Sequence, residues 1–213
     1  MFYDRNPSGI LRLGDIVQGF PLTATGFNPA PDGSRPEDFR VEVRQPPFAA
    51  VLSPCCSIGS STVLLSPLLR IQRSWFANDY FVGDFTNLNR PMTPEQAVSR
   101  DNWEKLTVEE RQKRLDLSSP GGSYVFLEMF VYAPHDILPV YPVKWKLEEK
   151  QVGHYTVDFR KTYKVECSQI SYPQSEGSPV ARMKRLQLSI ESRGQLRDKL
   201  SYYYGHPAPE DGV

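Results

Sequence analysis

Cysteine and histidine are the residue types here best able to bind a metal or to act as nucleophiles. Cys55 and Cys56 are adjacent in a Gly/Ser-rich turn, whereas Cys167, His154 and His135 lie far from them in the sequence. A tetrahedral zinc site would require the fold to gather these residues, and adjacent ligands are a poor geometry for one ion. A reactive thiol is the other functional interpretation. We favour small side chains packed beneath a turn, and we expect no metal and no cofactor.

Basic residues interleaved with aromatic residues form a second chemical pattern, near the C-terminus. The sequence contains Arg182, Lys184, Arg185, Arg193, Arg197 and Lys199, followed by Tyr202, Tyr203 and Tyr204. Such a mixture can bind RNA. A docked terminal helix with a solvated face predicts the same pattern equally well, because Glu191 and Asp198 dilute the charge. RNA contact through Arg182, Lys184 and Arg185 therefore stays open.

A third pattern is a dense group of aromatic residues between positions 68 and 88. It consists of Trp75, Phe76, Tyr80, Phe81 and Phe85. We favour the interpretation that most of these rings cover the open side of a barrel. The alternative is an exposed platform that stacks bases or binds a peptide, with Trp75, Phe76, Tyr80 and Phe81 as its binding residues.

Two short apolar runs must position much of this chemistry. They lie within Phe48–Leu69, each ends in Ser-Pro, and a Gly/Ser turn joins them. This pattern predicts two strands of one buried sheet, because each run is too short for a packed helix and proline removes a ladder donor where a strand ends. Before them, Ile10–Leu22 reads as a strand interrupted by Gly14 and Gly19, which predicts the bends that small barrels need.

The other strand patterns are clear but less decisive. Thr23–Asp38 is predicted to be an exposed loop, and Phe39–Arg44 to be a strand that buries Phe39, Val41 and Val43. Tyr124–Ala133 is the strongest strand pattern, and for its Glu128 we favour a water-facing position or an ion pair over a functional role. A hairpin is predicted between 143–147 and 154–163.

Residues that typically cap helix N-termini predict where the helices begin. Thr93–Gln96 and Thr107–Glu110 both read as helix starts, which predicts a two-helix insertion at about 93–118. Ser189 is a good N-cap for a C-terminal helix at about 190–204. Gly194 inside that helix predicts a close crossing over another element.

Composition excludes several classes of protein. The 213 residues have a formal net charge of zero, so no global field gathers nucleic acid. The three cysteines make no disulfide framework, which indicates a reducing compartment. The sequence has no signal-peptide pattern and no apolar run long enough to span a membrane, so we expect a cytoplasmic protein.

Taken together, Gly14-Asp15-Ile16-Val17, Val51-Leu52-Ser53-Pro54 and the run from Val63 to Leu68 resemble the core of the MazF/PemK family. A strand over 156–164 followed by Leu188-Ser189-Ile190-Glu191 is similar to how such proteins end. The family consists of small SH3-like barrels, most of them ribonuclease toxins of toxin–antitoxin pairs. The resemblance covers about the first third and the last quarter of the chain, and the central insertion has no counterpart in it.

The resemblance does not extend to the catalytic residues of the family. Its catalytic Arg-Pro pair falls on Pro47 and Phe48, and its catalytic Thr falls on Leu69. A ribonuclease that uses 2′-hydroxyl attack needs a cation for the phosphate and groups that move protons, which these side chains do not supply. Arg44, Arg70 and Arg73 could replace the missing cation only in a different register.

The sequence therefore predicts one mainly β (α+β) domain over 1–213, an SH3-like small barrel with the helical insertion and the C-terminal helix. The resemblance implies a non-catalytic, MazF-like binding module of a bacterial stress, toxin–antitoxin or phage-defence system. The alternative is a diverged, metal-independent endoribonuclease that cleaves single-stranded RNA. A protein partner is the main expectation, and RNA and a second copy of the chain are the others.

Overall fold

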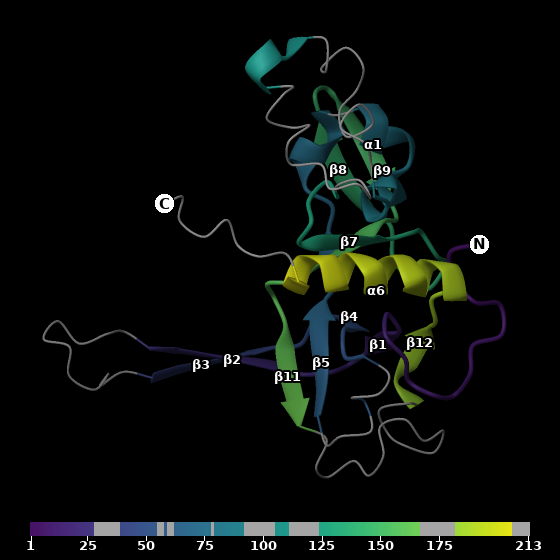
Figure 1. Cartoon of the computed structure of the whole chain (residues 1–213). Helices are drawn as coiled ribbons and strands as arrows, with labels where there is room; N and C mark the ends of the chain where they lie inside the picture. Colours follow the sequence, from purple (N-terminus) through teal and green to yellow (C-terminus); the bar gives the residue numbers. More distant parts are fainter. Residues whose placement is uncertain are drawn as a thin grey trace, which may run out of the picture. The chain divides into compact units, whose positions relative to one another are not determined.

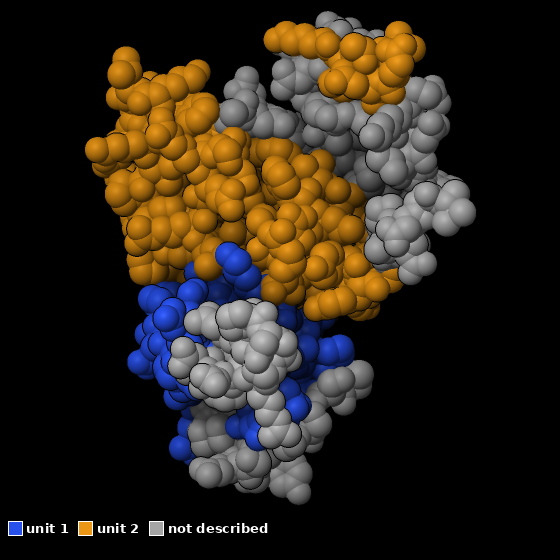
Figure 2. Space-filling view, turned by 90° about the vertical axis from the view of Figure 1, so that its left-hand side faces the viewer, with its two compact units in different colours: residues 1, 3–68, 161–189 blue, residues 2, 69–160, 190–213 orange. Residues whose placement is uncertain are grey.

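The computed structural model describes most of the chain, which divides into two compact units (Figure 2). The described residues are 1–27, 39–54, 58, 62–77, 79–91, 105–110, 124–166 and 182–205. Unit 1 comprises residues 1, 3–68 and 161–189, and unit 2 comprises residues 2, 69–160 and 190–213. The sequence pattern indicated one domain with an insertion and did not anticipate this division.

Unit 1 is built on a five-stranded sheet in the order β11-β5-β4-β1-β12. Its strands are β1 (Ile16–Gln18), β4 (Phe48–Val51), β5 (Thr62–Pro67), β11 (Tyr163–Glu166) and β12 (Lys184–Leu186). All neighbouring strands are antiparallel. The two strands predicted within residues 48–69 are therefore confirmed, and they lie beside the strand that follows Gly14 (Figure 1).

The apolar strand residues of unit 1 form its core, and Gly14 forms the bend that precedes β1. The buried cluster contains Leu11, Val17, Phe20, Leu22, Ala49, Val51, Ile58, Val63 and Leu65. Gly14 has a φ of 81°, a left-handed conformation that favours glycine. Its N–H donates to the carbonyl of Val51 at 2.7 Å, and the N–H of Val51 donates to the carbonyl of Asp15 at 2.9 Å. The bend at Gly14 thus directs the chain into β1, which pairs with β4 in the sheet.

The mainly β, α+β class is confirmed, but the closed barrel is not. Within the described parts of the chain no sheet closes on itself, and β11 and β12 lie at opposite edges of the five-stranded sheet. Unit 1 also contains a separate two-stranded ribbon. It consists of β2 (Leu22–Phe27) and β3 (Phe39–Arg44), which pair with each other. Figure 1 shows this ribbon extending away from β5 and β11.

The β2–β3 ribbon corrects two expectations. Residues 23–27 form a strand rather than a loop, and 28–38 lie outside the described residues. Val41 and Val43 are each 64% exposed instead of buried. The alternating pattern identified the strand correctly, but alternation does not reveal whether a second layer covers the apolar face.

In its described residues, unit 2 contains a three-stranded sheet, a hairpin and helices, four of which have described bounds. The sheet has the order β6-β10-β7, with β6 (Leu69–Arg70), β7 (Met129–Tyr132) and β10 (Tyr155–Asp158). The hairpin consists of β8 (Tyr141–Trp145) and β9 (Glu148–Val152). The helices are η1 (Arg73–Ala77), α1 (Asp79–Gly83), η2 (Phe85–Asn89) and α6 (Ile190–Gly205).

The hairpin predicted between 143–147 and 154–163 is wrong. β8 turns at Lys146 and Leu147 and pairs with β9, while β10 pairs with β6 and β7. Lys146 adopts a φ of 56°. Glycine or asparagine usually marks such a conformation, and without either the turn was invisible in the sequence.

The C-terminal helix is confirmed, with α6 beginning after Ser189 and burying Leu196 and Leu200. The close crossing predicted from Gly194 is wrong, because no described atom of another element lies within 4 Å of the position that a Cβ would occupy. No helix in the described ranges is long and apolar enough to cross a membrane.

The helical insertion is described only around its second capping box. The N–H of Thr107 donates to Glu110 Oε2 at 2.8 Å, and the N–H of Glu110 donates to Thr107 Oγ1 at 3.2 Å. This reciprocal pair of hydrogen bonds confirms the predicted capping box. The rest of the insertion, 92–104 and 111–123, lies outside the described residues.

Glu128 forms the ion pair that the sequence favoured. It lies just before β7, and its Oε1 is 3.7 Å from Arg160 Nη2. Arg160 also contacts the buried carboxylate of Asp158 at 2.8 Å. A structural role accounts for this carboxylate, and no chemistry need be assigned to it.

Candidate protein-interaction surface

The arginines considered for catalysis are divided between the two units. Arg44 lies in unit 1, whereas Arg70 and Arg73 lie in unit 2. The guanidinium of Arg44 donates to both carboxylate oxygens of Glu42, at 2.8 and 3.0 Å, and these hydrogen bonds lower the pKa of Glu42. The Arg70 guanidinium lies 5.1 Å from the centre of the Tyr141 ring, and Arg73 is exposed at the start of η1.

The aromatic residues expected between 68 and 88 are mostly core residues. Trp75, Phe76, Phe81 and Phe85 are all buried, and the Phe76 and Phe85 rings meet edge to face at 5.1 Å. Their burial confirms the favoured interpretation as core, although not as the cover of a barrel. An exposed platform of Trp75, Phe76 and Phe81 is excluded in this structure, and the side chain of Tyr80 lies outside the description.

His154 belongs to the same aromatic core and makes unit 2 sensitive to acid. Its ring lies edge-on to Phe85 at 5.2 Å, and burial lowers the pKa of His154 below 6.5 although Asp84 opposes this shift. Folding lowers the pKa of His154 below its value of 6.5 in the unfolded chain. The contribution of His154 to the free energy of unfolding is therefore fully present above pH 6.5, and it is lost as the pH falls from 6.5 towards the pKa of the folded state. Unfolding measurements near neutral pH and at about pH 5 should show this loss, and His154→Phe should reduce it. An identical loss in His154→Phe would assign the acid sensitivity to other groups.

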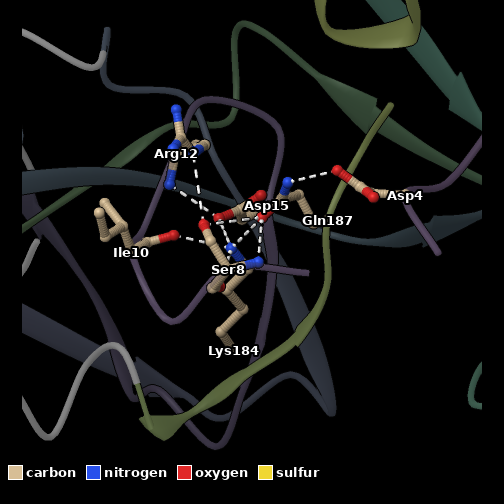
Figure 3. A network of polar contacts seen from close by, with 7 residues as sticks. All are labelled: Asp4, Ser8, Ile10, Arg12, Asp15, Lys184 and Gln187. Carbon is tan, nitrogen blue, oxygen red and sulfur yellow. Dashed lines mark hydrogen bonds and ion pairs between the residues drawn. The ribbon is translucent and has the colours of Figure 1, made fainter. Parts of the chain in front are cut away.

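The basic cluster considered for RNA contact includes a lysine that is buried inside unit 1. Lys184 in β12 has only 5% of its side chain exposed, and its Nζ lies 2.8 Å from Asp15 Oδ2. The same ammonium donates to Gln187 Oε1 at 2.6 Å and to the carbonyls of Ser8 and Ile10 at 2.9 and 2.7 Å (Figure 3). Its proposed role in binding is therefore corrected, because the ammonium ties the N-terminal segment to β12.

Further hydrogen bonds extend this network around Lys184. Asp15 Oδ2 also accepts from the N–H of Arg12 at 2.7 Å, and Gln187 Nε2 donates to Asp4 Oδ2 at 2.8 Å (Figure 3). These contacts give Asp15 a structural role.

The remaining basic residues are divided between the two units. Arg182 and Arg185 are exposed in unit 1, and Arg185 Nε donates to Gln18 Oε1 at 2.9 Å. Lys199 is fully buried in unit 2, where its Nζ donates to the carbonyls of Leu88 and Val125 at 2.5 and 3.2 Å. Burial lowers the pKa of Lys199 well below its ordinary value, and the nearby Glu128 carboxylate opposes this shift. Of the three basic residues named for RNA contact, Arg182 and Arg185 are exposed, and RNA binding through them remains a prediction.

The residues considered for metal binding are only partly described. Cys55, Cys56 and Cys167 lie outside the described residues. His135 Nδ1 accepts from the N–H of Ile137 at 3.2 Å, and His154 belongs to the aromatic core. Over the ranges that the structure does describe, no three His, Cys, Asp or Glu side chains gather as a metal site.

The feature that sequence reasoning missed is the exposed face of the β2–β3 ribbon. Val41 and Val43 are opposite Thr25 and Thr23 in the register, so these four residues share one face. All four are exposed. The opposite face of β3 carries the charged residues Arg40, Glu42 and Arg44. Only the failure of this strand to join the main sheet could have indicated the exposure, and the alternating pattern does not encode it.

Comparisons with family models, with curated proteins and with solved structures find no match.

Proposed function

We propose that this chain is a non-catalytic protein-binding module that binds its partner along β3. The observation that carries this proposal is the exposure of Val41 and Val43, at 64% each, on a strand whose outer edge pairs with no other strand among the described residues. Exposed β-branched side chains on a pleated surface pack well against another strand. Thr23 and Thr25 of β2, which lie opposite these valines, extend the same face.

The backbone of β3 offers a second mode of recognition. Among the described residues β3 pairs with β2 alone, so its outer edge is available to an added strand. In strand addition the main chain supplies hydrogen bonds, and side chains on alternate positions supply specificity. Glu42, flanked by Arg40 and Arg44, provides a charge pattern that a partner strand can match.

The wider setting that we propose rests on the resemblance to MazF/PemK proteins. The residues near the front of the chain that carry it lie in or next to β1, β4 and β5, which are neighbours in one sheet of unit 1. On this proposal the protein is a cytoplasmic, partner-binding component of a stress, toxin–antitoxin or phage-defence system. A partner encoded beside it is the first candidate.

The alternative, a diverged endoribonuclease, receives less support from the described residues. Arg44 engages a carboxylate two residues away on the same exposed strand, and Arg70 lies against the Tyr141 ring. Glu42 occupies the guanidinium of Arg44, and burial raises the pKa of Tyr141 beside Arg70 to about 12, so neither cation combines a free charge for phosphate with a neighbouring group suited to proton transfer near neutral pH.

Substituting the exposed valines should abolish partner binding. The full chain is co-expressed with the product of the adjacent gene, and the affinity of the purified complex is measured by calorimetry. Val41→Asp and Val43→Asp should each weaken binding at least about 10-fold, because burial of a valine contributes about 1.5–3 kcal/mol and a carboxylate adds a desolvation cost. Leu147→Asp is the matched control, since Leu147 is a fully exposed apolar residue on the other hairpin.

Two results would contradict the proposal. The first is unchanged affinity in both valine variants alongside weaker binding in Leu147→Asp, which would place the contact elsewhere. The second is cleavage of single-stranded RNA by the purified chain that Arg44→Ala or Arg70→Ala abolishes. That result would establish the ribonuclease alternative.

A further inference from the structure

We propose that the outer edge of β3 pairs antiparallel with β3 of a second copy of this chain, centred on Val41. This inference rests on the proposed function, since it names the partner of the same strand edge. The result would be a four-stranded sheet in the order β2-β3-β3-β2, related by a two-fold axis. Such an interface uses one surface patch on both copies and is closed.

The charges of β3 are complementary to themselves in this register. Pairing about Val41 places Arg40 opposite Glu42 of the second copy, and Glu42 opposite Arg40 of the second copy. Opposite charges directly across an antiparallel pair are favourable, whereas like charges are unfavourable. Both of these side chains are exposed in the single chain, where Glu42 pairs with Arg44. The two ion pairs would form on one face of the sheet.

The apolar residues are complementary in the same register. Val41 would lie opposite Val41 of the second copy, and Val43 would follow on the same face. Thr23 and Thr25 of β2 flank these valines on that face. Pairing would therefore bring the valines of the two copies side by side in one wider apolar stripe, with the threonines at its margins.

Other registers fit less well. Pairing about Glu42 would set two carboxylates opposite each other, which is destabilising. Pairing about Val43 would keep only residues 42–44 of β3 opposite one another, and it would extend into Pro46 and Pro47, which cannot donate to a ladder. Pairing about Val41 keeps residues 39–43 opposite one another, within the bounds of the strand.

Exchanging the charges tests both the pairing and its register. The mass of the full chain is followed by sedimentation equilibrium over a range of concentrations. Arg40→Glu should weaken self-association about 10-fold or more, because it faces Glu42 of the second copy, and Glu42→Arg should do the same because it faces Arg40. A mixture of the two variants should associate as a one-to-one dimer, because each new charge then faces an opposite one. Glu148→Arg, an exposed charge reversal on β9, should leave the mass unchanged.

A cysteine cross-link measures the register directly and captures a weak dimer. In a chain whose native cysteines are replaced by serine, Val41→Cys should form a disulfide between copies. Residues directly opposite across antiparallel strands have Cα atoms about 4.5–5.5 Å apart, which suits a disulfide. Val43→Cys should not cross-link, because the two copies of residue 43 would be offset by four residues, about 13 Å along the strand.

The outcomes separate this inference from the proposed function. A monomeric wild-type chain at every concentration, no association of the charge-exchanged mixture, and no Val41→Cys cross-link would overturn self-pairing. The proposed function would stand without self-pairing if the adjacent gene product still binds the wild-type chain and if Val41→Asp and Val43→Asp still weaken that binding. A cross-link through Val43→Cys instead of Val41→Cys would overturn the proposed register.

Discussion

Replacing Lys184 by methionine should lower the free energy of unfolding by about 3–5 kcal/mol, the cost of breaking a buried ion pair from one side. The carboxylate of Asp15 is fully buried, and the ammonium of Lys184 lies 2.8 Å from it. Methionine fills a similar volume but leaves a buried negative charge without its cation. Denaturant unfolding of the full chain measures the difference.

The ion pair is not the only interaction that this change removes. Lys184 Nζ also donates to the Ser8 and Ile10 carbonyls and to Gln187 Oε1. These bonds hold the N-terminal segment against β12, so increased hydrogen exchange in residues 8–12 should accompany the loss of stability.

Arg185→Met is the matched control, because Arg185 is the next cation on the same strand but is exposed. It should change stability by less than about 1 kcal/mol, since its one hydrogen bond to Gln18 is at the surface. The double variant Asp15→Asn with Lys184→Met should recover part of the loss, because no buried charge remains. A loss below about 1 kcal/mol in Lys184→Met, or no recovery in the double variant, would show that the pair does not stabilise unit 1.

The parts of the fold that the sequence predicted are those encoded locally. β4 and β5 are short apolar runs closed by Ser-Pro, and α6 begins after the N-cap residue Ser189. A capping box needs only Thr107 and Glu110, three positions apart. Each of these signals lies within a few residues of the element that it defines.

The features that the sequence did not predict depend on distant residues. Lys184 reads as a surface cation until the fold brings Asp15 from the other end of the chain to its side. The alternating pattern of β3 predicted that Val41 and Val43 are buried, but they are exposed. Alternation shows which side chains share a face of the strand, and it does not show whether another element packs on that face. The exposed strand on which the proposed function rests was therefore identified correctly as a strand and incorrectly as buried.

Asn89 should be the side chain whose loss most weakens the edge of the sheet in unit 2. It is fully buried at the end of η2, its Nδ2 donates to the carbonyl of Val131, and its Oδ1 accepts from the N–H of Val131, both at 2.7 Å. The amide thus takes the place of a neighbouring strand on the side of β7 away from β10. Asn89→Leu keeps a similar volume but leaves a buried donor and a buried acceptor of Val131 unsatisfied.

The expected cost of Asn89→Leu is about 2–6 kcal/mol, since each of the two unsatisfied buried groups costs about 1–3 kcal/mol. Gln151→Leu on β9 is the control and should be nearly neutral, because that amide is exposed. Hydrogen exchange at Val131 provides a local measurement, because its amide proton loses its acceptor only in the Asn89 variant. A loss below about 1 kcal/mol with the Val131 amide still protected would mean that another group satisfies this edge, and that Asn89 does not close it.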